Sequence, residues 1–560
     1  IKGWDGLFWK NQYEAFQQFF HEKNLAPYFG SIDSLTRAMG DVSFDHQGRR
    51  IQGMRMQNTG DVYAVNGWEA MPYDNHSGIV DIYRNCKGNP STFTYYTQPL
   101  YVAVSPRTQF VHLPGKVPVD FYIVNEKNLS GKYRLSVFVC TPDGKEGKHI
   151  EKEVHITGGD CFGQLLLEHC QLEIEGVSGL YQVKAQLRNA SGHLCAEGKD
   201  EVLGIYWDKK QLKGKGALYG TPDDPVATFY QKATGCELPA FHSDIEKLDW
   251  IVVTRSSLDA PQPVPVEAFC QKEGKSVLEL SLYKDDDLRT LAGVTQDNKI
   301  DRTFADGAQP DPLLPANQSF SAIWDGKLKA PQSGTYMIGV TSDQGMRLSV
   351  NGQRIVDEWR NNKELTVVRP FLLKAGDEVA VRVEYSQRNP TGSVQLVWSL
   401  PDHAAIAPQE LLDRVKEDGT SLLLLKSAES WMDAVSAYTG SAYHGYYSVG
   451  KNWVGGVHFV KEHPLFNGLP VNVAMGWPYQ ALVRNGDRRL GLHIDNEELV
   501  AGSYGSAPFN LGSAVGIISC GKGKIYYSTL DLVDNLNNPA AAADVARKLF
   551  CNFILLSKDR

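Results

Sequence analysis

Several features are missing from this 560-residue sequence, and each absence excludes a class of protein. No run of about 18 consecutive apolar residues occurs, so no transmembrane helix is expected. The net charge is −8, which argues against a nucleic-acid partner because phosphate binding requires a basic surface. No Cys-x-x-Cys pair occurs, and this excludes zinc-ribbon and thioredoxin-like sites.

The nine cysteines are scattered along the chain. Cys161 and Cys170 are the nearest pair in sequence, and one or two disulfide bonds are compatible with the spacing. Buried free thiols are the equal alternative, since cysteine often behaves as a small apolar residue.

The sequence begins without an initiator methionine or a signal peptide. Trp9, Tyr13, Phe16 and Phe20 fall at helical spacing near its start, which predicts an amphipathic helix. Because this helix begins so abruptly, we expect the chain to be the C-terminal part of a larger protein.

The length of 560 residues is too great for one hydrophobic core, so we expect several domains. Aromatic residues make up 10% of the chain. Two interpretations of this content are open: the aromatic side chains fill β-sandwich cores, or they form platforms on which sugar rings stack.

The pattern of predicted secondary structure changes once within the first 207 residues. Residues 1–98 show a helix, a polar connection and the strand-like run "DVYAV", followed by a loop rich in Pro, Asp, Asn, Ser and Gly. This order is typical of the last strand of a (β/α)8 barrel and its C-terminal loop. Residues 99–207 alternate apolar and polar positions between turn signals, which predicts an immunoglobulin-like β-sandwich.

The rest of the chain combines α/β and β patterns. Residues 213–276 and 402–560 contain the buried strands "DWIVVT" and "TSLLLLK", the hairpin "AVGIISCGKGKIYYSTL" and the closing helix "AAADVARKLFCNFILL". Between them, residues 277–401 are β-rich, with an Asn-Gly hairpin signal in "VNGQ". We predict one α/β domain interrupted by an inserted β-sandwich; adjacent independent domains are the alternative.

The segment "GDVYAVNGWEAMPYDNHSGIVDIYRNCKGNPSTFTYYTQPLYVAV" resembles the C-terminal half of glycoside hydrolase family 2 enzymes, the β-galactosidase and β-glucuronidase group. The resemblance covers about residues 1–207 and implies the remnant of a (β/α)8 barrel before the sandwich. A retaining glycosidase needs two carboxyl groups about 5–5.5 Å apart. The resemblance implies that both come from barrel strands upstream of Ile1, so this chain alone is expected to lack the catalytic pair.

The same resemblance implies a sugar-binding rim just after "DVYAV". The candidate substrate-binding residues are Asn66, Trp68, Glu69, Asp74, Asn75 and His76. Trp68 matches the family's aromatic floor of the sugar subsite, and the polar side chains suit hydrogen bonds to sugar hydroxyls. Glu69 is the one catalytic candidate, with substrate contact or a structural ion pair as alternatives. No cysteine or second histidine lies near His76, so no metal site is expected.

The sequence "FSAIWDGKLKAPQSGTYMIGVTSDQGMRLSVNGQRIVDEW" resembles the protective-antigen-type lectin-like module, which is often appended to carbohydrate-active enzymes. A calcium-dependent sugar site in such a module would need adjacent carboxylates, but "SDQG" offers Asp343 with Gln344 beside it. Asp357 is interpreted as fixing a turn. Sugar binding and a spacer or docking role are both open for this segment.

The split α/β domain resembles a class I glutamine-amidotransferase-like domain, a flavodoxin-like α/β fold that some β-galactosidases carry for assembly. Amidase activity would require a nucleophile on a strand-to-helix elbow and a histidine. Ser427 lacks flanking glycines, and His493 has no evident nucleophile partner in the sequence. We therefore expect neither amidase activity nor a cofactor.

Two functional hypotheses follow. The first is the C-terminal portion of a retaining glycoside hydrolase that acts on β-linked glycosides and contributes part of the active-site rim together with accessory domains. The alternative is a non-catalytic carbohydrate-binding or assembly protein. The expected partners are a carbohydrate and the N-terminal remainder of the same protein, with a homo-oligomer also compatible. The expected location is the periplasm or the exterior of a bacterium.

Overall fold

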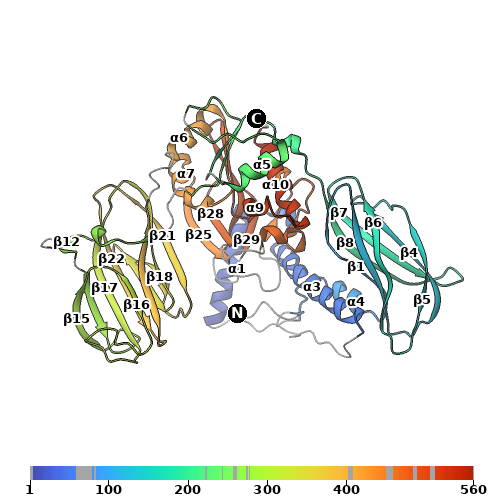
Figure 1. Cartoon of the computed structure of the whole chain (residues 1–560), viewed down its shortest axis with the longest axis horizontal. Coiled ribbons are helices and arrows are strands. Elements are labelled where there is room, and N and C mark those ends of the chain that lie inside the picture. Colours follow the sequence, from blue (N-terminus) through green and yellow to red (C-terminus); the bar gives the residue numbers. More distant parts are fainter. Residues whose placement is uncertain are drawn as a thin grey trace. The chain divides into compact units, whose positions relative to one another are not determined.

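The computed structural model describes residues 4–58, 79–80, 84–220, 223–242, 244–256, 262–272, 275–276, 278–400, 408–449, 458–483, 489–504 and 511–558. The chain divides into two compact units. Unit 1 comprises Ile1–Arg255 and Pro408–Arg560, and unit 2 comprises Ser256–Ala407. Strands dominate both units, and unit 1 also contains the long helices (Figure 1).

This architecture confirms the prediction of a multidomain chain that combines all-β and α/β parts. The barrel remnant and the flavodoxin-like assignment stay predictions, as do the five domain ranges. The segment predicted as an insertion, 277–401, lies within unit 2. None of the described helices is long and apolar enough to cross a membrane.

Unit 1 begins with helices. They are α1 (Trp4–Glu22), α2 (Ala26–Phe29), α3 (Ile32–Met56) and α4 (Ser91–Thr97). The helical stripe predicted for α1 is partly wrong: Phe16 and Phe20 are buried, but Tyr13 is 49% exposed. Phe19 takes its place in the core, where these rings pack with Phe459 of a later strand.

A β-sandwich follows in unit 1. Its strands are β1 (Leu100–Pro106), β2 (Phe110–His112), β3 (Gly115–Asn125), β4 (Gly131–Cys140), β5 (Ile150–Ile156), β6 (Gly163–Ile174), β7 (Gly179–Arg188) and β8 (Leu194–Ile205). They form two sheets with the orders β1-β3-β6 and β2-β8-β7-β4-β5. Alternating apolar residues of both sheets, such as Phe121 and Val183, fill the core between them.

The remainder of unit 1 is a mixed sheet with helices. Its strands are β9 (Gly216–Tyr219), β10 (Trp250–Val253), β24 (Ser421–Leu424), β25 (Tyr443–Val449), β26 (His458–Val460), β27 (Val473–Ala474), β28 (Arg489–Ile494), β29 (Glu498–Tyr504), β30 (Leu511–Cys520) and β31 (Gly523–Ser528). Its helices are α5 (Pro225–Thr234), α6 (Pro408–Asp413), α7 (Met432–Thr439), α8 (Gln480–Val483), α9 (Leu532–Asn535) and α10 (Asp544–Leu556). The main path of the sheet runs β27-β26-β29-β30-β31-β24-β10-β9.

Local patterns explain this part of unit 1. Strands β9, β10, β24 and β31 run parallel, and every residue of β10 and β24 is buried, as expected for strands covered on both faces. Helix α5 begins where Asp224 accepts a hydrogen bond from the Val226 N–H, and it ends at Gly235 with φ 77°. The predicted hairpin is confirmed by the antiparallel pairing of β30 and β31, and the predicted closing helix is α10.

Unit 2 is a second β-sandwich. Its strands are β11 (Gln262–Pro263), β12 (Gln271–Lys272), β13 (Lys275–Ser276), β14 (Leu278–Tyr283), β15 (Leu291–Asp297), β16 (Asp301–Phe304), β17 (Phe320–Lys329), β18 (Gly334–Ser342), β19 (Gly345–Val350), β20 (Gln353–Glu358), β21 (Leu365–Leu373), β22 (Glu378–Gln387) and β23 (Gly392–Ser399). One sheet has the order β11-β23-β18-β21, with β16 beside β23, and the other has the order β15-β14-β17-β22-β19-β20. Their inner faces enclose one core that includes Trp324, Tyr336 and Tyr385.

The Asn-Gly hairpin signal in unit 2 is confirmed. Strands β19 and β20 pair across Asn351 and Gly352, whose φ angles are 48° and 80°. Positive φ at both central residues is the requirement of the tight type I′ turn, which asparagine and glycine tolerate best.

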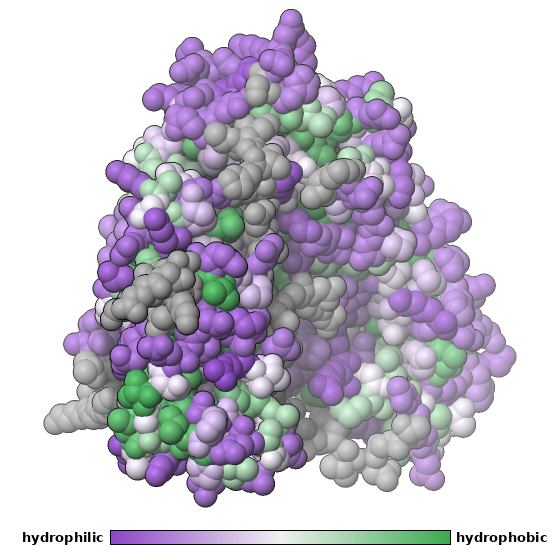
Figure 2. Space-filling model, turned by 60° about the vertical axis from the view of Figure 1, so that its left-hand side comes forward, coloured by the Kyte–Doolittle hydropathy of each residue, from purple (hydrophilic) through white to green (hydrophobic). Residues whose placement is uncertain are grey.

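The face of the molecule drawn in Figure 2 is mostly hydrophilic, and hydrophobic residues gather there in small areas.

All nine cysteines are free thiols in this structure. Cys161 and Cys170, the pair nearest in sequence, are both half-buried and are not bonded to each other. Of the two alternatives that the sequence left open, the structure therefore favours unpaired cysteines.

Candidate functional site

An open pocket of about 580 Å³ lies in unit 2, lined by residues 302–310, 317–320 and 387–390. We call it the loop pocket. The end of β16, the β16–β17 loop and the start of β17 form one part of its wall, and the end of β22 with the following loop forms the other. It is larger than two other pockets in the described residues, which measure about 420 and 320 Å³.

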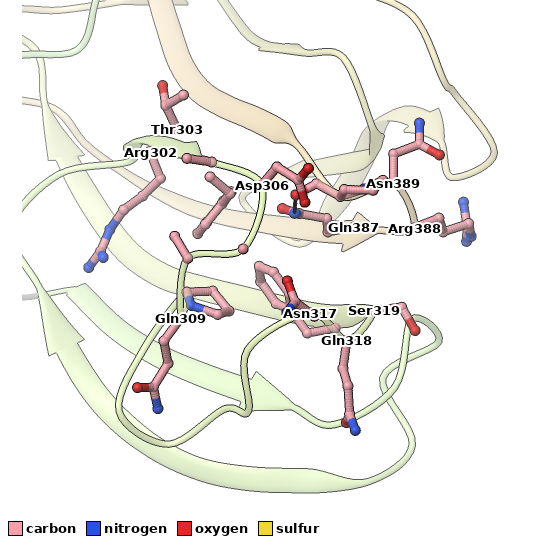
Figure 3. A pocket seen from close by; sticks show the side chains of 17 residues that line it. Arg302, Thr303, Asp306, Gln309, Asn317, Gln318, Ser319, Gln387, Arg388 and Asn389 are labelled. Atoms are coloured by element: carbon pink, nitrogen blue, oxygen red, sulfur yellow. Dashed lines mark hydrogen bonds between the residues drawn. The ribbon is translucent and has the colours of Figure 1, made fainter.

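The wall of the loop pocket carries many uncharged hydrogen-bonding groups and one carboxylate, Asp306, which forms no ion pair among the described residues. Its polar side chains include Asp306, Gln309, Asn317, Gln318, Ser319 and Asn389. Figure 3 shows that they come from both parts of the wall, with Asp306 near Gln387 in the view and Asn317 near Gln318 and Ser319. Amide, hydroxyl and carboxylate groups together offer both donors and acceptors to a polyhydroxylated ligand.

Aromatic rings support the same wall. Phe304 is half-buried and lines the pocket together with Phe320. The Phe304 ring stacks on Tyr385 with a centroid distance of 5.5 Å and meets the edge of Phe320 at 5.1 Å. These packed rings fix the orientation of Phe304, which gives the pocket a rigid apolar surface beside its polar groups.

The two arginines of the pocket are neutralised by carboxylates of neighbouring segments. Arg302 lies 2.8 Å from Asp297, whose side chain is 8% exposed. Arg388 donates to Asp286 over 2.9 Å. In Figure 3 the guanidinium groups of Arg302 and Arg388 extend in opposite directions. The pocket therefore presents no uncompensated cation to a ligand.

The segment that carries Asp286 is itself fixed by hydrogen bonds. Asp285 accepts from the backbone N–H groups of Arg289, Asp287 and Thr290, and these bonds hold the pKa of Asp285 at about 2. Ser386 donates to the backbone carbonyl of Asp286 over 2.7 Å. These bonds fix the backbone that carries Asp286, whose carboxylate neutralises Arg388.

The end of β22 is ordered by a buried hydroxyl. Burial raises the pKa of Tyr385 far above its ordinary value, so the phenol stays a hydrogen-bond donor even at alkaline pH. Its O–H donates to Gln387 Oε1 over 2.8 Å, and the Gln387 side chain is buried beneath the loop.

Among the described residues, no group of three or more His, Cys, Asp or Glu side chains could hold a metal ion.

The residues predicted from the sequence as a sugar-binding rim lie outside the described residues. They are Asn66, Trp68, Glu69, Asp74, Asn75 and His76. Their roles in substrate binding, and that of Glu69 in catalysis, stay predictions. The nearest described residues after them are Ile79 and Val80, and Val80 forms an isolated bridge with Cys86.

The acidic residues singled out in unit 2 have structural partners. Asp343 accepts a hydrogen bond from the Ser393 N–H over 2.6 Å, which joins the β18–β19 turn to the start of β23. The interpretation of Asp357 as a turn residue is wrong. Asp357 lies within β20, where it faces Arg347 across the β19–β20 pair and forms an ion pair with it, and it forms a second ion pair with Arg354 of its own strand.

The residues considered for amidase chemistry lie in different elements of unit 1. Ser427 follows β24 with φ 52° and ψ 35°, a left-handed conformation at a strand-to-helix turn, and its carbonyl accepts from Ser430. His493 lies in β28, and burial lowers its pKa from 6.5 to about 4, with a further contribution from Lys23. No hydrogen bond joins Ser427 to His493 in the part of the chain that the structure describes.

Sequence reasoning passed over the residues of the loop pocket. Their signal is the segment "FADGAQPDPLLPANQSF", residues 304–320, which joins two strands and is rich in Gly, Pro, Asn, Gln and Asp. A connection of this length inside a compact domain is uncommon and is often a binding loop. This criterion would have identified one part of the wall, but not the part from β22.

The family model of the PA14 domain matches residues 274–411. This confirms the predicted resemblance of the central segment to the protective-antigen-type module. The anti-sigma-I factor RsgI3 of Acetivibrio thermocellus is 29% identical over 117 residues, which cover 21% of this chain and 18% of that protein. The chain therefore spans less than a fifth of this curated relative. The resemblances to glycoside hydrolase family 2 and to amidotransferases stay predictions.

Two solved structures are similar to parts of the chain. A β-glucosidase from Kluyveromyces marxianus has 16% identity and a TM-score of 0.22, covering 40% of this chain and 30% of that one. A PA14 sugar-binding domain from an RTX adhesin has 19% identity and a TM-score of 0.17, covering 22% of this chain and 87% of that one.

Proposed function

We propose that unit 2 is a carbohydrate-binding module and that the loop pocket is its binding site. The observation that carries the proposal is the position of the pocket: all of its wall lies within residues 274–411, which match the PA14 domain. The function proposed for the chain as a whole is therefore carbohydrate contact, without a catalytic role for the described residues.

The lining of the loop pocket supports a polyhydroxylated ligand. Asn317, Gln318 and Asn389 are exposed amides, each of which offers two donors and an acceptor. A sugar presents neighbouring hydroxyl groups that need both kinds of partner. Phe304 adds an apolar surface on which the C–H face of a sugar ring can rest.

The electrostatics of the pocket favour a neutral sugar over an acidic one. Arg302 is paired with Asp297, and Arg388 is paired with Asp286. A uronic or sialic acid would need an available cation, and it would also meet the carboxylate of Asp306. We therefore propose a neutral mono- or oligosaccharide as the ligand.

A glycan array probed with the full chain tests this proposal. We expect binding to neutral glycans, weakened about 10-fold by Asp306→Ala or by Asn317→Gly because each removes hydrogen bonds to the ligand. Glycine is chosen at Asn317 because its φ is 57°. Gln353→Ala removes an exposed amide that does not line the pocket and serves as the control. Binding only to acidic glycans, or equal binding by all variants, would refute the assignment.

A second candidate function is the hydrolysis of β-glycosides by a longer parent protein. It is favoured by the resemblance of residues 1–207 to family 2 glycosidases. For this parent protein we also propose export from a bacterial cell and assembly into a homo-oligomer. Nitrophenyl β-glycosides should be cleaved by an N-terminally extended protein but not by these 560 residues. Cleavage by this chain that Glu69→Gln abolishes would show instead that Glu69 is catalytic.

A further inference from the structure

Gln344 joins the loop pocket to the rest of unit 2 without lining the pocket itself. The residue lies in the β18–β19 turn and is 3% exposed. Its Oε1 accepts hydrogen bonds from the backbone N–H groups of Arg388 and Asn389 over 3.2 and 3.4 Å. Its Nε2 donates to the backbone carbonyl of Thr391 over 3.0 Å. One buried carboxamide thus holds the backbone of the β22–β23 loop at three points.

The chemistry of these partners fixes the orientation of the carboxamide. Backbone N–H groups can only donate, and the Thr391 carbonyl can only accept, so only a group with both an acceptor and a donor satisfies the loop. Gly392 allows the close approach, because a Cβ at this position would lie 2.9 Å from Gln344 Cγ. The loop therefore passes directly over the Gln344 side chain.

The neighbours of Gln344 are fixed as well. Ser342 Oγ accepts from the Gln344 N–H over 3.1 Å, and Asn361 Nδ2 donates to the Gln344 carbonyl over 3.2 Å. Asp343 binds the Ser393 N–H, which anchors the start of β23. The backbone of Gln344 is thus fixed by Ser342 and Asn361, and its side chain bonds the loop backbone.

We propose that Gln344 is a positioning residue of the loop pocket. Its carboxamide holds residues 388–391 in the conformation that presents Asn389 and Pro390 to the ligand, so that this loop needs no ordering when a sugar binds. The ligand in this inference rests on the proposed function. The ordering of the loop is a separate claim that can be measured without any ligand.

The variant Gln344→Glu gives the sharpest test. A protonated glutamic acid keeps a carbonyl acceptor for Arg388 and Asn389 and an O–H donor for Thr391, whereas the ionised form faces the Thr391 carbonyl with a negative charge. Burial at this position should raise the pKa of the new carboxyl above about 4.3. We expect binding of the neutral glycan with the strongest array signal to be weakened about 10-fold at pH ~8 and restored to within about threefold at pH ~5. The wild-type chain should show no comparable recovery at low pH.

Two further variants distinguish an effect on the position of the loop from a general loss of stability. Gln344→Met has a similar shape but cannot bond the loop, so its binding should be weakened at both pH values. Strands β19 and β22 pair with each other, and Gln344 lies near one end of this pair. Asn351→Gly removes one hydrogen bond at the other end, where the Ala380 N–H donates to the Asn351 side chain. This control should bind the glycan as the wild-type chain does.

Amide hydrogen exchange in the absence of ligand tests the ordering directly. We expect the amides of Arg388 and Asn389 to exchange about 10-fold faster in Gln344→Met than in the wild-type chain, while those of Asn351→Gly stay unchanged. Unchanged exchange in Gln344→Met, or binding by Gln344→Glu that equals the wild type at pH ~8, overturns the inference. If the exchange result holds but no glycan binds, the proposed function fails and the loop support stands.

Discussion

The two units each bury a polar side chain that joins distant segments, but they use opposite chemistry. In unit 1, Glu497 has a fully buried side chain and accepts hydrogen bonds from Lys23 over 2.6 Å and from the hydroxyls of Ser513 and Tyr527. In unit 2, the neutral carboxamide of Gln344 bonds only to the backbone of a surface loop.

The difference reflects what each group connects. Lys23 follows helix α1, so the charged pair ties a helix to the sheet strands that carry Ser513 and Tyr527. Removing one buried charge leaves its partner uncompensated, which costs far more than losing a neutral hydrogen bond. Gln344 orders a loop beside an open pocket, where the effect on stability is small and the effect on the shape of the pocket is large.

The largest effect is expected for Glu497→Gln in unit 1. The substitution leaves the Lys23 ammonium, whose side chain is 12% exposed, without its carboxylate. We expect a loss of about 3 kcal/mol in the free energy of unfolding, measured by urea denaturation. The double variant Lys23→Met/Glu497→Gln should be less destabilised than Glu497→Gln alone, because no unpaired charge remains.

An exposed pair provides the control for this prediction. Lys10 and Glu14 are 3.6 Å apart on helix α1, and their side chains are 61% and 56% exposed. Glu14→Gln should change the free energy of unfolding by less than about 0.5 kcal/mol. If Glu497→Gln is as mild as Glu14→Gln, the buried pair does not stabilise unit 1 as described.

The next effect concerns pH in the same region of unit 1. Burial, with contributions from Lys23 and His444, lowers the pKa of His493 from 6.5 to about 4. A histidine with a lowered pKa in the folded state favours the neutral form. Its contribution to stability is therefore complete above pH 6.5 and is lost as the pH falls toward about 4. We expect a loss on the order of 1–2 kcal/mol over this range, after allowance for partial exposure.

The variant His493→Gln isolates this contribution, because it cannot take up a proton. Thermal unfolding of the variant should depend less on pH between 6.5 and about 4 than that of the wild-type chain. Parallel pH profiles for the two proteins would show that His493 does not titrate as the structure implies.

A smaller effect on stability is expected for Gln344→Met in unit 2. The substitution keeps most of the buried volume but removes three hydrogen bonds to the loop at Arg388, Asn389 and Thr391. Because that loop is solvent-exposed, water can satisfy its freed groups, and we expect a loss of about 1 kcal/mol by urea denaturation. A loss as large as that of Glu497→Gln would erase the contrast between the units.

The smallest effect is expected for Asn351→Gly. Glycine accepts the positive φ of 48° at this turn, so only the hydrogen bond from the Ala380 N–H is lost. The melting temperature should fall by about 1–2 °C, which corresponds to a few tenths of a kcal/mol. A large fall would show that the turn depends on the asparagine side chain more than its geometry suggests.

Local features of the fold could be predicted from the sequence because they depend on neighbouring residues. The hairpin at Asn351 and Gly352 follows from two residues that tolerate positive φ, and helix α10 follows from an apolar pattern with a helical period. The register of α1 was harder, since Tyr13 and Phe19 are both aromatic and only packing against Phe459 selects Phe19.

The candidate site could not be predicted because its parts meet only in the folded chain. The two parts of its wall are about 70 residues apart in sequence, and Gln344 lies between them in a third segment. Lys23 and Glu497 are 474 residues apart, and no local pattern links them. The sequence instead drew attention to Trp68 and Glu69, whose motif is compact and readily compared with a known family.

The proposal that the loop pocket is a carbohydrate site is tested most directly by locating a bound sugar. Crystals of the full chain grown with the neutral glycan that binds best on the array should show it in contact with Asp306, Asn317 and Asn389. Its ring should lie beside Phe304, and the Gln344 bonds to the loop should be unchanged. A glycan bound elsewhere in the chain, with the loop pocket empty, would contradict the account.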